Sequence, residues 1–171
     1  MMYFHEEQQF RQRWLWQLFG AVSIPIVGLL GYGVYQQLFL GNPFGTHPAS
    51  NRQLSGVFIA VLVLHSLVIA LFWYARLDVE VDETDVAIRF RPFHLKPRRI
   101  ALHKIADARA RHYSALGEYG GWGIRAGIHG SAYNVSGDDG VQLTLADGRR
   151  ILIGSRRSGE LEAAIRRAKA V

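Results

Sequence analysis

The stretch from Leu54 to Tyr74 reads LSGVFIAVLVLHSLVIALFWY and contains no Asp, Glu, Lys or Arg. A helix needs about 20 predominantly apolar residues to cross the roughly 30 Å hydrocarbon core of a bilayer. This stretch is long enough, and its aliphatic side chains favour insertion more than Ser55, His65 and Ser66 oppose it. The sequence therefore predicts a membrane-spanning helix over residues 54–75.

A second apolar stretch, Trp14 to Leu40, precedes the first in the chain. Between Leu18 and Tyr35 its only polar side chain, apart from tyrosine hydroxyls, is Ser23. Residues 41–53 contain prolines and glycines and form a short connection. The pattern predicts a hairpin of two spans, at about 14–40 and 54–75. The first stretch is too long for the apolar core of a cleaved signal peptide, so we expect it to be retained.

The basic residues near the spans predict how the hairpin is oriented. Arg11 and Arg13 precede the first span and Arg76 follows the second, whereas the connection carries only Arg52. Cytoplasmic loops hold an excess of Lys and Arg. Both termini are therefore expected in the cytoplasm, with the connection outside. We expect residues 1–13 to be an interfacial lead-in to the first span, so that the first region of the protein covers residues 1–75.

From Arg76 onward the sequence changes period. Leu77, Val79 and Val81 alternate with acidic residues, which is typical of a half-buried strand. Further alternating segments and turn signals such as Asp147-Gly148 follow, and residues 161–168 return to helical spacing. The fold class predicted is α+β: a transmembrane helix hairpin, then a small antiparallel β-barrel or sandwich over residues 76–171. About seven strands and a C-terminal capping helix are expected there.

Several segments resemble the bacterial pleckstrin-homology-like (PH-like) domains of small two-span membrane proteins. They are Glu7–Gln12, Gly121–Arg125, Ala132–Gly137 and Asp147–Gly154. The resemblance implies a PH-like fold and a location in the bacterial cytoplasmic membrane. It implies no catalytic residues, and a fold does not by itself define a function.

The second region is basic, with 17 Lys and Arg against 12 Asp and Glu from Arg76 onward. A basic region tethered to a bilayer can face anionic headgroups, where each Lys or Arg contributes about 1 kcal/mol. An ordinary solvated surface is the alternative, and the tether makes nucleic acid an unlikely partner. The candidate residues for lipid or partner binding are Arg89, Arg91, Lys96, Arg98, Arg99, Lys104, Trp122, Arg149 and Arg150.

His65 is the candidate polar site inside the membrane, because ionisable residues at that depth often have a function. The alternative is a neutral imidazole hydrogen-bonded to the other helix. The chain has no cysteine, and its histidines lack the spacing of a zinc site. The glycines of residues 121–130 do not fit a dinucleotide fingerprint. We therefore expect no metal, no cofactor and no enzyme activity.

These observations favour a docking or adaptor protein over other classes. Its cytoplasmic domain would bind a protein partner or anionic lipid headgroups, and an open sheet edge could accept a partner strand. The alternative is an accessory subunit of a membrane transporter or complex, which would require polar groups within the bilayer beyond His65 and Ser66. A membrane-bound enzyme is the third possibility.

Overall fold

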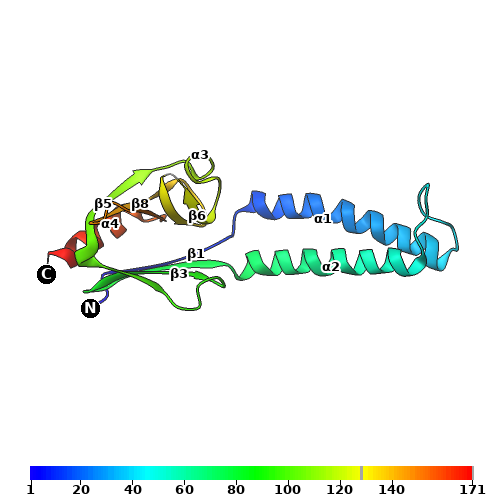
Figure 1. The fold of residues 1–171 in the computed structure, drawn as a ribbon, viewed down its shortest axis with the longest axis horizontal. Coiled ribbons are helices and arrows are strands. Elements are labelled where there is room, and N and C mark those ends of the chain that lie inside the picture. Colours follow the sequence, from blue (N-terminus) through cyan, green and yellow to red (C-terminus); the bar gives the residue numbers. More distant parts are fainter. Residues whose placement is uncertain (128, 171) are drawn as a thin grey trace. The chain divides into compact units, whose positions relative to one another are not determined.

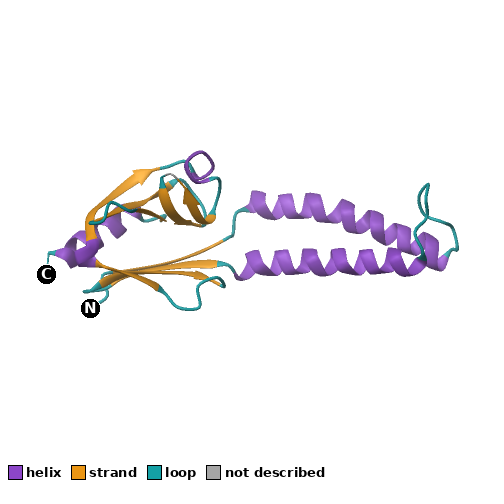
Figure 2. Cartoon of the chain, in the orientation of Figure 1, coloured by secondary structure: helices purple, strands orange, loops and turns teal. Residues whose placement is uncertain are grey.

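A computed structural model describes residues 1–127 and 129–170 of the chain (Figure 1). The chain divides into two compact units. The strand-rich unit consists of Met1–Phe10 and Tyr74–Val171, and the helical unit consists of Arg11–Trp73. Figure 2 shows long helices in the helical unit and the strands in the other unit.

The helical unit is a pair of helices, as the sequence predicts. Helix α1 covers Arg13–Val34 and continues as a π-helical turn, η1, over Tyr35–Phe39, and helix α2 covers Asn51–Tyr74. Both are long and apolar enough to cross a membrane, and few of their apolar side chains are buried.

Contacts at both ends of the hairpin hold the two helices together. At one end the rings of Trp16 and Trp73 lie 5.6 Å apart, and Arg11 lies over the Trp73 ring at 4.6 Å. At the other end the Gln37 side chain donates hydrogen bonds to the Ala49 carbonyl and to the side chain of Asn51. The connection between the helices is therefore an ordered loop.

The strand-rich unit contains two sheets. The first has the order β1-β2-β3-β4, and all its neighbouring strands are antiparallel. Its strands are β1 (Phe4–Gln9), β2 (Arg76–Val81), β3 (Asp85–Arg91) and β4 (Arg98–Ala101).

Strand β1 corrects the expectation of an interfacial lead-in over residues 1–13. Residues Phe4–Gln9 are a strand that pairs along β2, with Gln9 opposite Arg76 and Phe4 opposite Val81. The first residues of the chain thus belong to the same compact unit as residues 74–171, and not to the hairpin. The sequence did not predict this strand, because two of the residues that β1 turns inward, Glu6 and Gln8, are polar.

The second sheet has the order β5-β8-β9-β7-β6. The remaining elements of the unit are η2 (Leu102–Lys104), β5 (Ile105–His112), α3 (Ala115–Tyr119), β6 (Gly123–Gly127), β7 (Gly130–Asn134), β8 (Asp139–Leu145), β9 (Arg150–Gly154) and α4 (Ser158–Lys169). Gly130 has φ +100°, and a Cβ there would collide with the Arg150 carbonyl, so only glycine fits where β7 begins beside β9.

The α+β class is confirmed, but the structure differs from the expected domain in two details. From Arg76 onward the described residues form eight strands, close to the seven expected, and β1 adds a ninth; these strands form two sheets and no closed barrel. The second sheet is not wholly antiparallel, because β7 and β9 pair in parallel. The glycine-rich segment, residues 115–127, contains α3 and β6.

Helix α4 forms where the spacing of residues 161–168 predicts a helix, and it buries Leu161, Ala164, Ile165 and Ala168. It contacts β5 and β8 of the second sheet and also β1 and β2 of the first. Its polar side chains also reach the outer edge of β5. Glu162 accepts a hydrogen bond from the Ala110 amide at 2.7 Å, and Lys169 donates to the Ile105 carbonyl at 2.6 Å. The helix therefore blocks a strand edge that would otherwise be open to pairing.

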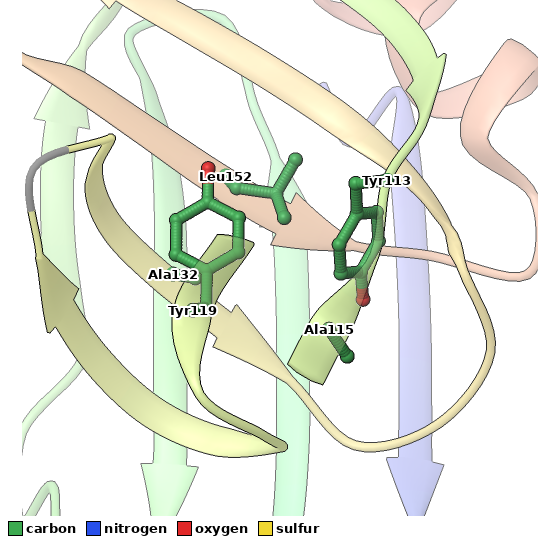
Figure 3. Packing of buried hydrophobic residues seen from close by; sticks show 5 residues of the cluster. All are labelled: Tyr113, Ala115, Tyr119, Ala132 and Leu152. Atoms are coloured by element: carbon green, nitrogen blue, oxygen red, sulfur yellow. The ribbon is translucent and has the colours of Figure 1, made fainter. Parts of the chain in front are cut away.

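A separate aromatic cluster fills one end of the second sheet. Tyr113, Ala115, Tyr119, Ala132 and Leu152 come together from α3, β7, β9 and the residue that follows β5 (Figure 3). The Tyr113 and Tyr119 rings meet edge to face at 6.1 Å. This packing explains how the glycine-rich segment is held on the sheet.

Candidate functional site

Two adjoining hollows on the strand-rich unit, which we call the basic cleft, bring together five of the nine candidate residues. The larger hollow has a volume of about 440 Å³ and the smaller one about 240 Å³, and they share Arg98, Arg149 and Ile151. The five candidate residues in the cleft are Arg98, Arg99, Lys104, Arg149 and Arg150. They come from β4, η2, the turn between β8 and β9, and the start of β9.

Two of the five cations are already paired with carboxylates. Arg99 lies 2.9 Å from Asp85, and the hydrogen bond between them raises the pKa of Arg99. Arg149 lies 2.7 Å from Asp147, and this hydrogen bond lowers the pKa of the Asp147 carboxyl. Both arginines are exposed to solvent, so the pairs contribute little to stability.

The other three cations have no acidic partner within the part of the chain that the structure describes. Arg98 donates a hydrogen bond of 2.5 Å to the Tyr133 hydroxyl, and its guanidinium lies 5.9 Å from the centre of that ring. Lys104 and Arg150 form no ion pair among residues 1–127 and 129–170. Asp85 also lines the smaller hollow, where it pairs with Arg99, so the cleft keeps a net positive charge from the other three cations.

Four of the nine candidate residues lie outside the cleft. Arg89 donates a hydrogen bond to the Leu95 carbonyl at 3.0 Å, and Arg91 lies 3.0 Å from Asp78. Lys96 is exposed between β3 and β4. Trp122 packs against the aromatic cluster and lines another hollow of about 380 Å³. The candidate set is therefore not one surface.

His65 makes a local hydrogen bond within its own helix. Its Nδ1 lies 2.9 Å from the Val61 carbonyl, four residues earlier in α2. We expected the alternative to a functional role to be a bond to the other helix, and the observed partner is different. This contact satisfies one polar group of the ring within α2 itself.

The structure also assembles a group that sequence analysis did not find. His112 lies with one ring nitrogen 3.3 Å from Asp138 and the other 3.3 Å from Asp139. These three side chains could hold a metal ion, because their donor atoms lie within 4.8 Å of one another. All three side chains are exposed, and the carboxylates face opposite ring nitrogens, so only one nitrogen could serve a given ion. The sequence pattern indicated only a turn at Asp138-Asp139.

A buried polar contact joins β1 to the segment between β9 and α4. The Glu6 carboxylate accepts hydrogen bonds from the Ser155 hydroxyl at 2.5 Å and from the Arg156 amide at 3.1 Å. Gln8 donates to the Gly154 carbonyl at 2.8 Å. About 150 residues separate the partners, so nothing in the local sequence indicates the contact.

Comparison with known proteins yields no relative: no family model, no curated protein and no solved structure matches the chain. The resemblance to PH-like domains thus remains a prediction from sequence motifs. Fold and site together define a helix hairpin combined with a two-sheet unit that carries a cleft of unneutralised positive charge.

Proposed function

We propose that the chain is an integral protein of the bacterial cytoplasmic membrane, and that its strand-rich unit is a cytoplasmic, PH-like docking module. The module binds anionic groups, carried by a protein partner or by lipid headgroups, in the basic cleft. The single observation that carries this proposal is the convergence of Arg98, Lys104 and Arg150 on adjoining hollows without a carboxylate partner among the described residues.

Membrane insertion is supported by the exposed apolar surface of the helices. Ile24 is 73% exposed and Leu67 is 63% exposed, and large aliphatic and aromatic residues along both helices are exposed in the same way. Soluble monomers rarely leave such continuous apolar surfaces in water. In a bilayer, lipid tails would cover this surface, so its apolar side chains would not be exposed to water.

The pairing of β1 with β2 supports a topology in which both helices are retained. The chain enters the hairpin just after Gln9 and leaves it just before Arg76, and these two residues face each other across the strands. Both ends of the hairpin must then lie on one side of the membrane. Cleavage after the first helix would remove β1 and leave Leu77, Val79 and Val81 on a strand without that partner.

The chemistry of the cleft fits a carboxylate or a phosphate. Guanidinium groups form paired, charge-assisted hydrogen bonds with either anion. The Tyr133 hydroxyl positions Arg98 at the boundary of the two hollows, and Lys104 and Arg150 lie in one hollow each. An anion that spans the cleft would interact with all three cations.

The test is charge reversal in the full-length protein, with a matched control. The double variant Lys104→Glu/Arg150→Glu changes the cleft, and Arg109→Glu/Arg167→Glu makes the same charge change at two exposed residues outside it. After mild cross-linking in native membranes, we expect wild type and control to retain a stoichiometric partner or labelled anionic lipid. The cleft variant should lose it.

Equal retention by both variants would contradict docking in the cleft. Recovery of a transporter as the partner would make the chain an accessory subunit, with the cleft as its docking surface. Turnover of a substrate by the purified chain alone would overturn the docking proposal in favour of an enzyme.

A further inference from the structure

The loop between β3 and β4, residues 92–97, displays apolar side chains next to basic ones. Leu95 is 86% exposed and Phe93 is 58% exposed. Arg91 precedes the loop, Lys96 lies within it, and Arg98 follows it. An exposed apolar tip with a basic border is the arrangement found in segments that lie in the interfacial layer of a bilayer.

Hydrogen bonds and a ring contact connect the loop to β3 and β7 and leave its tip exposed. The His94 amide donates to the Phe90 carbonyl at 2.7 Å, and Arg89 donates to the Leu95 carbonyl at 3.0 Å. The His94 ring turns inward and meets the Tyr133 ring edge to face at 5.6 Å. With His94 anchored in this way, its neighbours Phe93 and Leu95 remain exposed to solvent.

Chain connectivity keeps this loop close to the membrane helices. Arg91 is paired with Arg76 across β2 and β3, so their Cα atoms are about 5 Å apart. Arg76 follows Tyr74, the last residue of α2, by two residues, which span at most about 7 Å. Phe93 is two residues beyond Arg91, or about 7 Å more. Its Cα therefore lies within about 20 Å of the end of α2, whatever the orientation of the two units.

We propose that loop 92–97 is a third membrane contact, in which Phe93 and Leu95 enter the interfacial layer of the bilayer and Lys96 faces anionic headgroups. The inference rests on the proposed membrane insertion of the helices. A lipid surface is the occupant that fits, because a single strand pair, Arg76 with Arg91, connects the loop to the end of the proposed spanning helix. Its basic border is also complementary to an anionic surface.

Single-cysteine labelling can test this proposal directly, since the natural chain contains no cysteine. Phe93→Cys and Leu95→Cys would each carry an environment-sensitive fluorophore in the full-length protein, reconstituted in anionic vesicles with quenchers on the lipid chains. Leu67→Cys in α2 reports on the spanning segment. Glu83→Cys is the control. Strand β2 begins at Arg76 and ends at Val81, so Glu83 lies about 20 Å along the chain from Arg76, beyond the far end of the strand.

We expect blue-shifted emission and strong quenching at positions 67, 93 and 95, with weak quenching at position 83. Quenching at 67 but not at 93 and 95 would overturn the loop proposal and leave the membrane-spanning helices intact. Absence of quenching at 67 would mean that the proposed insertion itself has failed. Because Phe93 and Leu95 are exposed, the labelled variants should unfold at the same temperature as the parent protein, which verifies that the fold is retained.

Discussion

The two units of this protein distribute the same kinds of apolar side chain in opposite ways. In the strand-rich unit Leu77, Val79 and Leu143 have no exposed surface, whereas in the helical unit Ile24 and Leu67 are mostly exposed. Water drives apolar groups into a core, but lipid tails impose no such requirement. This difference is what we expect if the two units face different solvents, and the predictions below test that expectation.

The largest expected effect is the loss of a leucine from the core of the strand-rich unit. Leu143→Ala should destabilise that unit by about 2–5 kcal/mol, because it leaves a cavity among close-packed side chains. Leu67→Ala in α2 should have little effect, since its side chain faces outward. Denaturant unfolding in detergent, followed by tyrosine and tryptophan signals, measures both. Equal destabilisation by the two variants would mean that the Leu67 side chain is buried against another protein surface.

The next largest effect should come from the buried polar contact of β1. Glu6→Ala leaves the Ser155 hydroxyl and the Arg156 amide without their carboxylate, which should cost about 1–3 kcal/mol. Glu7→Ala is the matched control, because Glu7 lies on the outward face of β1 and its ion pair with Arg76 is partly exposed. The free energy of unfolding in urea distinguishes them. A control variant as unstable as Glu6→Ala would argue against β1 as an integral strand.

A smaller effect should appear on acidification, through His94. Burial is the main cause that lowers the pKa of His94 below its ordinary value of 6.5, with a further contribution from Arg98. The unfolded chain then binds a proton more readily than the folded one, so stability is complete above pH 6.5 and decreases as the pH falls below it. Thermal unfolding of wild type and His94→Gln between about pH 7.5 and pH 5 tests this.

His94→Gln should show a flatter dependence on pH over that range. His103→Gln, which changes an exposed histidine on η2, should behave as wild type. An unchanged pH dependence in His94→Gln would show that another group is responsible.

Sequence reasoning succeeded where one local rule was sufficient. The two helices follow from unbroken apolar runs, and α4 follows from its spacing of three and four residues. The hairpin at Asp147-Gly148 follows from turn chemistry. Each of these features depends on neighbours within a few turns or strands of the chain.

The features that were missed depend on distant partners. Strand β1 pairs with a strand about 70 residues later, and its inward Glu6 gave no apolar alternation to recognise. The parallel pairing of β7 with β9 brings together segments on either side of β8. In the same way, Arg98 and Arg150 enter one cleft from strands that belong to different sheets, so only part of the predicted basic set forms a site.

The central claim is that the hairpin crosses the membrane and returns both of its ends to the side of the strand-rich unit. Two single-cysteine variants test it most directly: His47→Cys, in the loop between the helices, and Glu83→Cys, in the strand-rich unit. In intact bacterial cells an impermeant maleimide should label His47→Cys at once and Glu83→Cys only after the membrane is opened. Labelling of Glu83→Cys in intact cells, or equal labelling of both variants, would contradict the account.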